Sequence, residues 1–341
     1  MNLAKKIIIA LIILIFIGAF STSYSSLNLD KLIYVLAIGI DSAPNNQLEV
    51  TFQFSKPLSP ESGSTETAKT TTNTVVASSL SNAINLVNSY QERQLNLSHC
   101  KIIIFSEKLA SIGIENEIFT LINDTQIRPS SNIVISKCTA KDYINNTQPE
   151  VENLISKYYE MFTDSSKYTG HLPDATIGNF FNALCCQSCD AYAILGNMST
   201  DDSFVTGTNN TRNVGVAVFR NDKLVGELNI PETISFLAIK NKVERFLISV
   251  PDPLNNDEFI DLYVTPYKSP KISVDTSTSS PYISVKCYFS ARIYSMTSNS
   301  QYLSADVLNS VSNYCNSYLE AMFLDYLYAT SKEYSADITG L

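Results

Sequence analysis

The segment from Arg212 to Val250 constrains the fold of this chain most, because it holds a strand, a turn, a strand, a helix and a strand in one short span. Its first strand alternates small residues with branched ones, namely Val214, Val216 and Val218. This alternation predicts a strand with one branched face. Polar residues 220–223 follow, and then Leu224-Val225-Gly226, a pattern typical of a tight antiparallel hairpin.

A helix is predicted directly after this hairpin. Pro231 and Glu232 suit a first helical turn, where a missing N–H costs nothing and a carboxylate faces the positive end of the helix dipole. Lys240 and Lys242 complement the other end. The expected buried stripe consists of Ile234, Leu237 and Ala238. We therefore expect a small hairpin-helix middle unit over residues 213–255.

Residues 27–200 are expected to form an N-terminal α/β-type domain, because strand-like and helix-like segments alternate along them. The expected strands are 31–41, 48–54, 101–105 and 133–135, and the expected helices are 80–88, 115–122, 149–162 and 176–185. Asp41 is interpreted as the end of the first strand and the start of a turn. The Ser/Thr-rich stretch 57–74 is interpreted as an exposed, mobile loop. The polar stretch 197–213 marks the expected domain boundary.

Residues 256–341 predict a C-terminal domain in which an antiparallel sheet is covered by a long helix. Apolar residues alternate with polar ones from residue 283 to 293, so one face of that strand is expected in the core and the other in water. Apolar residues then recur at helical spacing over about 305–332. The whole chain is therefore expected to be a multidomain α+β protein.

The first residues, 1–26, have the pattern of a signal or membrane-anchor segment. Lys5 and Lys6 precede an uninterrupted apolar run from Ile7 to Phe20, followed by small polar residues. The run is short for a membrane-spanning helix and matches the length of a signal h-region. Two outcomes stay open: the segment is retained as a tilted membrane anchor, or it is cleaved near Ser23-Tyr24-Ser25. In both cases the rest of the chain lies outside the cytoplasm.

Composition and charge narrow the class of partner. The formal net charge is −9, with only 24 Lys and Arg. Nucleic-acid binding needs clustered cations that displace counterions from phosphates, so we expect no nucleic-acid partner.

One cysteine cluster has a spacing that could carry chemistry, and its members are Cys185, Cys186 and Cys189. A zinc site would need a second pair of ligands, and no second half-site exists in the sequence. Three interpretations stay open: unpaired thiols, a disulfide that suits an exported protein, and metal or redox chemistry. No nucleophile elbow, zinc-peptidase motif or phosphate loop is present. We therefore assign no catalytic, cofactor-binding or metal-binding residues and no cofactor, and expect no enzymatic activity.

Six short segments together resemble the Ger(x)C family, the C subunits of spore germinant receptors. These segments are Gly39-Ile40-Asp41, the run from Leu97 to Ile114, Ala217-Val218-Phe219, Lys223-Leu224-Val225-Gly226, Glu232-Thr233 and Ser335–Leu341. In that family the N-terminal segment ends in a lipobox whose cysteine is acylated. Here Ala19 stands at the position of that cysteine, so acylation by that route is excluded. Members of the family usually continue through a further helix and strand. The resemblance therefore implies that this chain is truncated, or that the missing strand leaves an unpaired edge in the C-terminal sheet.

The resemblance implies the function of an exported, membrane-associated receptor subunit. Such a subunit lies at the outer face of the spore inner membrane and acts with integral-membrane receptor subunits to couple a nutrient signal to germination. We expect a non-catalytic binding or scaffolding component. The alternatives are a generic extracytoplasmic binding protein and a thiol enzyme built on Cys186 and Cys189.

Overall fold

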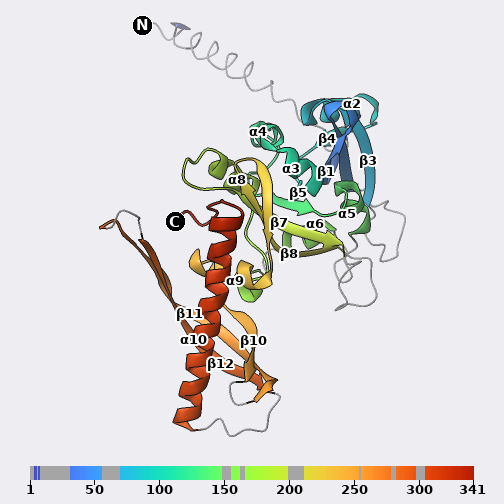
Figure 1. Ribbon diagram of the computed structural model, residues 1–341. Helices are drawn as coiled ribbons and strands as arrows, with labels where there is room; N and C mark the ends of the chain where they lie inside the picture. Colours follow the sequence, from blue (N-terminus) through green and yellow to red (C-terminus); the bar gives the residue numbers. More distant parts are fainter. Residues whose placement is uncertain are drawn as a thin grey trace.

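The computed structural model contains two β-sheets, each with its own helices, and a long helix that leads back from the second sheet toward the first (Figure 1). It describes residues 4, 5, 7, 31–55, 70–147, 155–161, 166–198, 211–252, 255–277, 282–296 and 304–341. The expected α+β architecture is confirmed. None of the helices formed by these residues has the length and apolarity needed to cross a membrane. The apolar residues 8–20, and with them Ala19, lie outside the described part.

Nine strands of the described chain form the first sheet, in the order β3-β2-β1-β5-β6-β7-β8-β9, with β4 paired to β1. Strands β1, β5, β6 and β7 run parallel, whereas the outer strands pair antiparallel. The strands are β1 (Leu32–Ala43), β2 (Gln47–Ser55), β3 (Thr70–Ala77), β4 (Gln94–Asn96), β5 (Ile102–Ser106), β6 (Asn132–Ser136), β7 (Tyr192–Met198), β8 (Thr211–Arg220) and β9 (Lys223–Leu228).

Helices cover both faces of this sheet. They are α2 (Leu80–Tyr90), α3 (Glu107–Ile112), α4 (Glu115–Asn123), α5 (Ala140–Asn146), α6 (Ile155–Met161) and α8 (Ile177–Leu184). The short helix α7 (Ser166–Thr169) instead contacts residues 246–252 of the second sheet. One core contains residues of α2, α3, α4 and α8, and the opposite core contains residues of α5 and α6. Ser79, Thr139 and Thr176 begin α2, α5 and α8 by accepting a backbone N–H of the first turn.

The hairpin predicted from residues 214–226 is present as β8 and β9, and both faces of β8 are buried. Val216 and Val218 pack into the core of the second sheet, whereas Ala217 and Phe219 pack into the core of the first. The valines share one face, as predicted, and the opposite face is buried as well. Two opposite cores meet at this strand, because consecutive side chains point to opposite faces. The hairpin extends the first sheet and so joins it to the second core.

The next helix, α9 (Ile230–Ile239), begins with a capping box. The Asn229 side chain accepts the Glu232 N–H, and the Glu232 carboxylate accepts the Asn229 N–H. Every residue from Thr233 to Ile239 is buried. The predicted stripe of three residues is therefore too narrow, because α9 packs between β8, the second sheet and the last helix.

The second sheet has the order β10-β11-β12, formed by β10 (Phe246–Asp252), β11 (Asn255–Asp275) and β12 (Tyr282–Met296). Helix α10 (Ala305–Tyr328) lies across it and continues into a π-helical turn, η3 (Ala329–Glu333) (Figure 1). The predicted strand 283–293 and the predicted long helix are both confirmed. The far ends of β11 and β12 extend past α10 as a two-stranded ribbon.

Three local expectations need correction. Thr70–Thr74, expected in a loop, lie in β3, because this threonine-rich strand pairs with β2 along its whole length; residues 56–69 lie outside the described part. Asp41 lies inside β1, and the turn is formed by η2 (Pro44–Asn46). At the ribbon end of β12, Ile283 is 40% exposed, although alternation placed it in the core, since α10 does not cover that end.

Candidate functional site

The turn between β8 and β9 is a meeting point for distant parts of the chain. Asn221 has a φ of 55°, a left-handed conformation that asparagine tolerates at a tight turn. The Ile114 N–H donates to the Asp222 carbonyl at 3.1 Å. Beside it, Gly113 has a φ of 132°, and a Cβ there would overlap the Asp222 carboxylate. The Gly113-Ile114 motif thus holds the hairpin turn against the connection between α3 and α4.

Asp190 ties this turn to the end of the chain. Its carboxylate accepts the Asn221 N–H at 3.0 Å and the Asp337 N–H at 2.8 Å. Its own N–H donates to the Asp337 carbonyl at 2.8 Å. Hydrogen bonds to an ionised acceptor are stronger than neutral ones. One carboxylate therefore joins the start of β7, the hairpin turn and the C-terminal segment.

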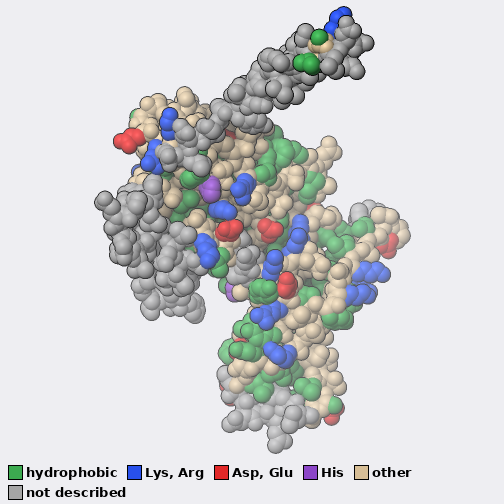
Figure 2. All heavy atoms as spheres, turned by 180° about the vertical axis from the view of Figure 1, so that it is seen from behind, with side chains coloured by type: hydrophobic (Ala, Val, Ile, Leu, Met, Phe, Trp, Pro, Cys, Tyr) green, Lys and Arg blue, Asp and Glu red, His purple; other side chains and the backbone are tan. Residues whose placement is uncertain are grey.

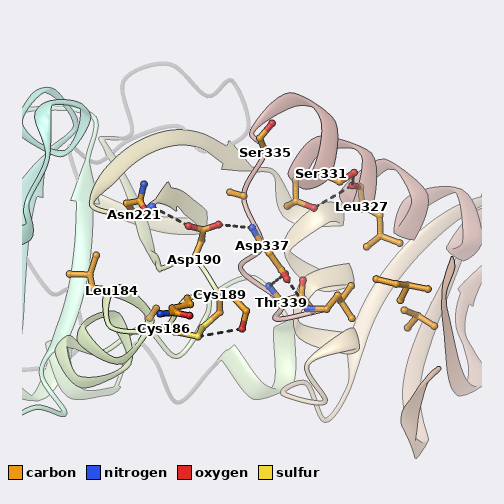
Figure 3. A pocket seen from close by; sticks show the side chains of 18 residues that line it. Leu184, Cys186, Cys189, Asp190, Asn221, Leu327, Ser331, Ser335, Asp337 and Thr339 are labelled. Carbon is orange, nitrogen blue, oxygen red and sulfur yellow. Dashed lines mark hydrogen bonds between the residues drawn. A yellow bond between two sulfur atoms is a disulfide. The ribbon is translucent and has the colours of Figure 1, made fainter. Parts of the chain in front are cut away.

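Asp337, in the Ala-Asp-Ile-x-Gly motif, folds the C-terminal segment onto itself. Its carboxylate accepts the N–H groups of Thr339, Gly340 and Leu341 at 3.1, 2.7 and 2.8 Å (Figure 3). Three backbone donors occupy the carboxylate, so its role is structural. The motif makes a compact turn that presents the Asp337 backbone to Asp190.

A second contact joins the β8–β9 hairpin to the C-terminal segment, and it lies at Gly226 of β9. A Cβ at this glycine would overlap the Tyr334 ring, and the Tyr334 hydroxyl donates to the Glu227 carbonyl at 3.0 Å. Burial raises the pKa of this hydroxyl above its ordinary range, which lies well above neutral pH already, so the hydroxyl is protonated and can donate. The last glycine of the Lys-Leu-Val-Gly motif is therefore required for close approach of the segment after α10.

Lys240 completes this junction from the end of α9. Its Nζ donates to the carbonyls of Ile338 and Thr339 at 3.2 and 3.4 Å. The same ammonium lies 5.5 Å from the centre of the Tyr192 ring and 5.7 Å from that of Phe236. Burial lowers the pKa of Lys240, and the nearby Asp337 carboxylate opposes this shift. The lysine thus holds the C-terminal turn with backbone and ring contacts.

A cleft of 620 Å³ opens beside this junction (Figure 3). It is lined by the loop 186–190, by Asn221, by Ile283 and Val285 of the ribbon, and by the chain from the end of α10 to residue 341. The two carboxylates that line the cleft, Asp190 and Asp337, already accept backbone N–H groups, which leaves them poorly suited to acid-base chemistry.

The structure separates the members of the cysteine cluster. Cys186 and Cys189 form a disulfide with a Cα–Cα separation of 5.7 Å, and both line the cleft. Cys185 is an exposed free thiol. In the second core, burial raises the pKa of Cys287 and of Cys315. No group of three His, Cys, Asp or Glu side chains that could hold a metal ion occurs within the described ranges.

The Gly39-Ile40-Asp41 motif has a structural explanation. A Cβ at Gly39 would lie 2.9 Å from Ile144 Cδ1 and 3.1 Å from Ala140 Cβ, so the glycine lets α5 approach β1. The buried Asp41 carboxylate accepts the N–H groups of Ala140 and Lys141 at 2.8 and 3.1 Å. Burial raises the pKa of Asp41, and these hydrogen bonds oppose the shift. The motif therefore docks and caps α5.

The residues that hold the junction were only partly visible to sequence analysis. The hairpin, Gly226 and the Asp337 motif were singled out, whereas Asp190, Tyr334 and Lys240 were not assigned any contact. Their partners are distant in sequence, and no local pattern marks them.

Comparison with known proteins defines the class of this molecule. A family model described as spore germination protein N-terminal domain matches residues 25–195. A second, described as spore germination B3/GerAC like, C-terminal, matches residues 214–341. The chain belongs to the Ger(x)C family of spore germination proteins, and the resemblance seen in the sequence is confirmed.

A solved structure, the crystal structure of the GerBC protein, shares this fold. The two chains are 17% identical, with a TM-score of 0.52, and the match covers 89% of this chain and 84% of the other. At this level of identity the likeness shows the fold alone. No curated protein matches the chain.

Proposed function

We propose that this chain is the exported, membrane-associated subunit of a nutrient germinant receptor and is required for spore germination. It acts with integral-membrane receptor subunits at the extracytoplasmic face of the spore inner membrane. Its role is that of a non-catalytic binding or scaffolding component. The observation that carries this proposal is the match of both halves of the chain to spore germination domains.

The arrangement of the family motifs supports a scaffold. The motifs at Gly113, Gly226 and Asp337 supply close backbone approaches and backbone hydrogen bonds at the junction of the two sheets. A catalytic centre would instead be expected to direct free polar side chains into a cleft. The motifs thus fix how the first sheet and the second core are joined, as a subunit that transmits a signal between partners would need.

Deletion of the gene tests the proposal directly. Nutrient-triggered germination should be lost, while spore formation and chemically forced germination stay intact, and re-expression should restore the response. Affinity purification of the complemented subunit from spore membranes should recover integral-membrane partners. Normal nutrient germination after deletion, in a strain without a second copy of the gene, would contradict the receptor role.

The disulfide beside the cleft keeps the thiol enzyme as the rival to test. Replacing Cys186 and Cys189 by serine opens a very short loop, so chain entropy alone predicts a loss of about 2 kcal/mol of folding free energy. The receptor proposal predicts that spores carrying C186S/C189S germinate normally. A folded C186S/C189S protein that fails to support germination would favour thiol chemistry.

A further inference from the structure

The ribbon formed by the far ends of β11 and β12 carries one cationic, aromatic face. Over residues 263–275 and 282–294 the sequence contains Lys268, Lys271, Lys286 and Arg292 but only one carboxylate, Asp275. This contrasts with the net charge of −9 for the chain. Seen from behind, blue side chains gather over the ribbon at the right of the view (Figure 2).

The register of the ribbon places like charges opposite each other. Lys271 pairs directly with Lys286 across the two strands, and both side chains are exposed. Like charges at directly opposite positions of an antiparallel pair are destabilising. The ion pairs found between described residues involve other lysines and none of the ribbon cations. The repulsion is therefore uncompensated within the described part of the chain.

Tyrosines lie between these cations on the same face. Lys268 lies 4.9 Å from the centre of the Tyr288 ring, and Arg292 lies 5.9 Å from that of Tyr263. At the margins, Tyr267, Tyr282 and Tyr294 are 66%, 68% and 61% exposed. Exposed tyrosine rings combined with lysines are typical of surfaces that lie at the headgroup level of a membrane.

The tip of the ribbon adds exposed aliphatic side chains. Ile272 and Val274 are 46% and 58% exposed, on the opposite face from the lysines. Helix α10 covers the other end of this sheet and leaves the tip projecting from the body (Figure 1). Entering a bilayer tip-first, the ribbon places these aliphatic side chains in the upper acyl region, while the long lysine side chains extend back to the headgroups.

We propose that the β11–β12 ribbon binds an anionic lipid surface, with Lys268, Lys271 and Lys286 at the phosphates and the tyrosines at the headgroup boundary. The inference goes beyond the receptor role and does not depend on it. A lipid surface fits better than an acidic protein because exposed tyrosines and an aliphatic tip accompany the cations. The phosphates of an anionic lipid surface would also neutralise the repulsion between Lys271 and Lys286.

Binding of the full-length chain to vesicles tests this proposal. Vesicles of equimolar phosphatidylcholine and phosphatidylglycerol are compared with vesicles of phosphatidylcholine alone, at low and at high salt. The K271Q/K286Q variant should bind the anionic vesicles about thirtyfold more weakly than the unaltered chain, with a weaker dependence on salt. Vesicles of phosphatidylcholine alone should bind K271Q/K286Q and the unaltered chain equally. Any binding through the apolar N-terminal segment is the same in both proteins, because that segment is unchanged.

A matched variant, K108Q/K332Q, removes two exposed lysines elsewhere and should bind anionic vesicles like the unaltered chain. Thermal unfolding of K271Q/K286Q should occur at the same temperature or a higher one, because a like-charge pair is removed. Equal affinity of K271Q/K286Q and the unaltered chain for anionic vesicles would overturn the proposal. The proposal would also be overturned if K271Q/K286Q lost binding to poly-L-glutamate but still bound anionic vesicles. That result would assign the face to an acidic protein.

Discussion

Asp190 and Asp337 form a reciprocal pair across 147 positions of the chain. The Asp190 carboxylate accepts the Asp337 N–H, and the Asp337 carbonyl accepts the Asp190 N–H, both at 2.8 Å. The same Asp190 carboxylate also holds the Asn221 N–H at the β8–β9 turn. The end of the chain is thus fixed to the first sheet at a point where the second core begins.

Replacing Asp190 by alanine should loosen this junction. Two backbone N–H groups lose a charged acceptor, and we expect the free energy of unfolding to fall by about 2–3 kcal/mol. Urea unfolding of the purified protein measures the change. E92A, at an exposed glutamate after α2, is the control and should stay within about 0.5 kcal/mol of the unaltered protein. Equal stability of D190A and E92A would contradict the assigned role.

Gly226→Ala should destabilise the protein through one neighbour. The added Cβ overlaps the Tyr334 ring, and relieving such overpacking typically costs about 1–3 kcal/mol. A double-mutant cycle with Tyr334→Ala isolates the contact, because G226A should cost much less once the ring is gone. If G226A is equally costly in both backgrounds, the contact with Tyr334 is not the cause.

The Gly39 contact with α5 gives a similar test in the first sheet. G39A brings a Cβ to 2.9 Å from Ile144 Cδ1, and we expect a loss of about 1–3 kcal/mol of unfolding free energy. Ile144→Val removes that Cδ1, so G39A should cost less in the I144V background. Chemical denaturation of the four proteins provides the measurement, and an unchanged cost would show that α5 does not depend on this glycine.

His171 should make stability fall as the solution is acidified. Burial lowers the pKa of this imidazole below its ordinary value of 6.5. The unfolded chain therefore takes up a proton at a pH where the folded chain does not, and stability falls as pH drops from 6.5 toward the folded pKa. H171Q should show a flatter stability profile between pH 7 and 5, as measured by thermal unfolding. Parallel profiles for the two proteins would contradict the burial of this side chain.

The local sequence pattern was sufficient to predict those strands and helices whose apolar residues recur at one regular period. The alternation from Ile283 to Ile293 predicted β12, the apolar repeat after Ala305 predicted α10, and the polar turn at residues 220–223 predicted the β8–β9 hairpin. In each case a side-chain period of two or of 3.6 fixes the backbone conformation that can bury the apolar residues. The family resemblance likewise rested on short local segments, of which the β8–β9 hairpin is one.

Tertiary structure alone decided which faces were buried and which distant groups met. Both faces of β8 are buried because a second core lies behind the first sheet, and the tip of β12 is exposed because α10 does not reach it. Asp190, Tyr334 and Lys240 contact backbone groups about 100 or more positions away. Such bonds depend on how whole elements pack, and a backbone acceptor has no side-chain identity that a sequence pattern could reveal. The sequence by itself therefore determined the elements and the family, and packing determined the junction that holds the two sheets together.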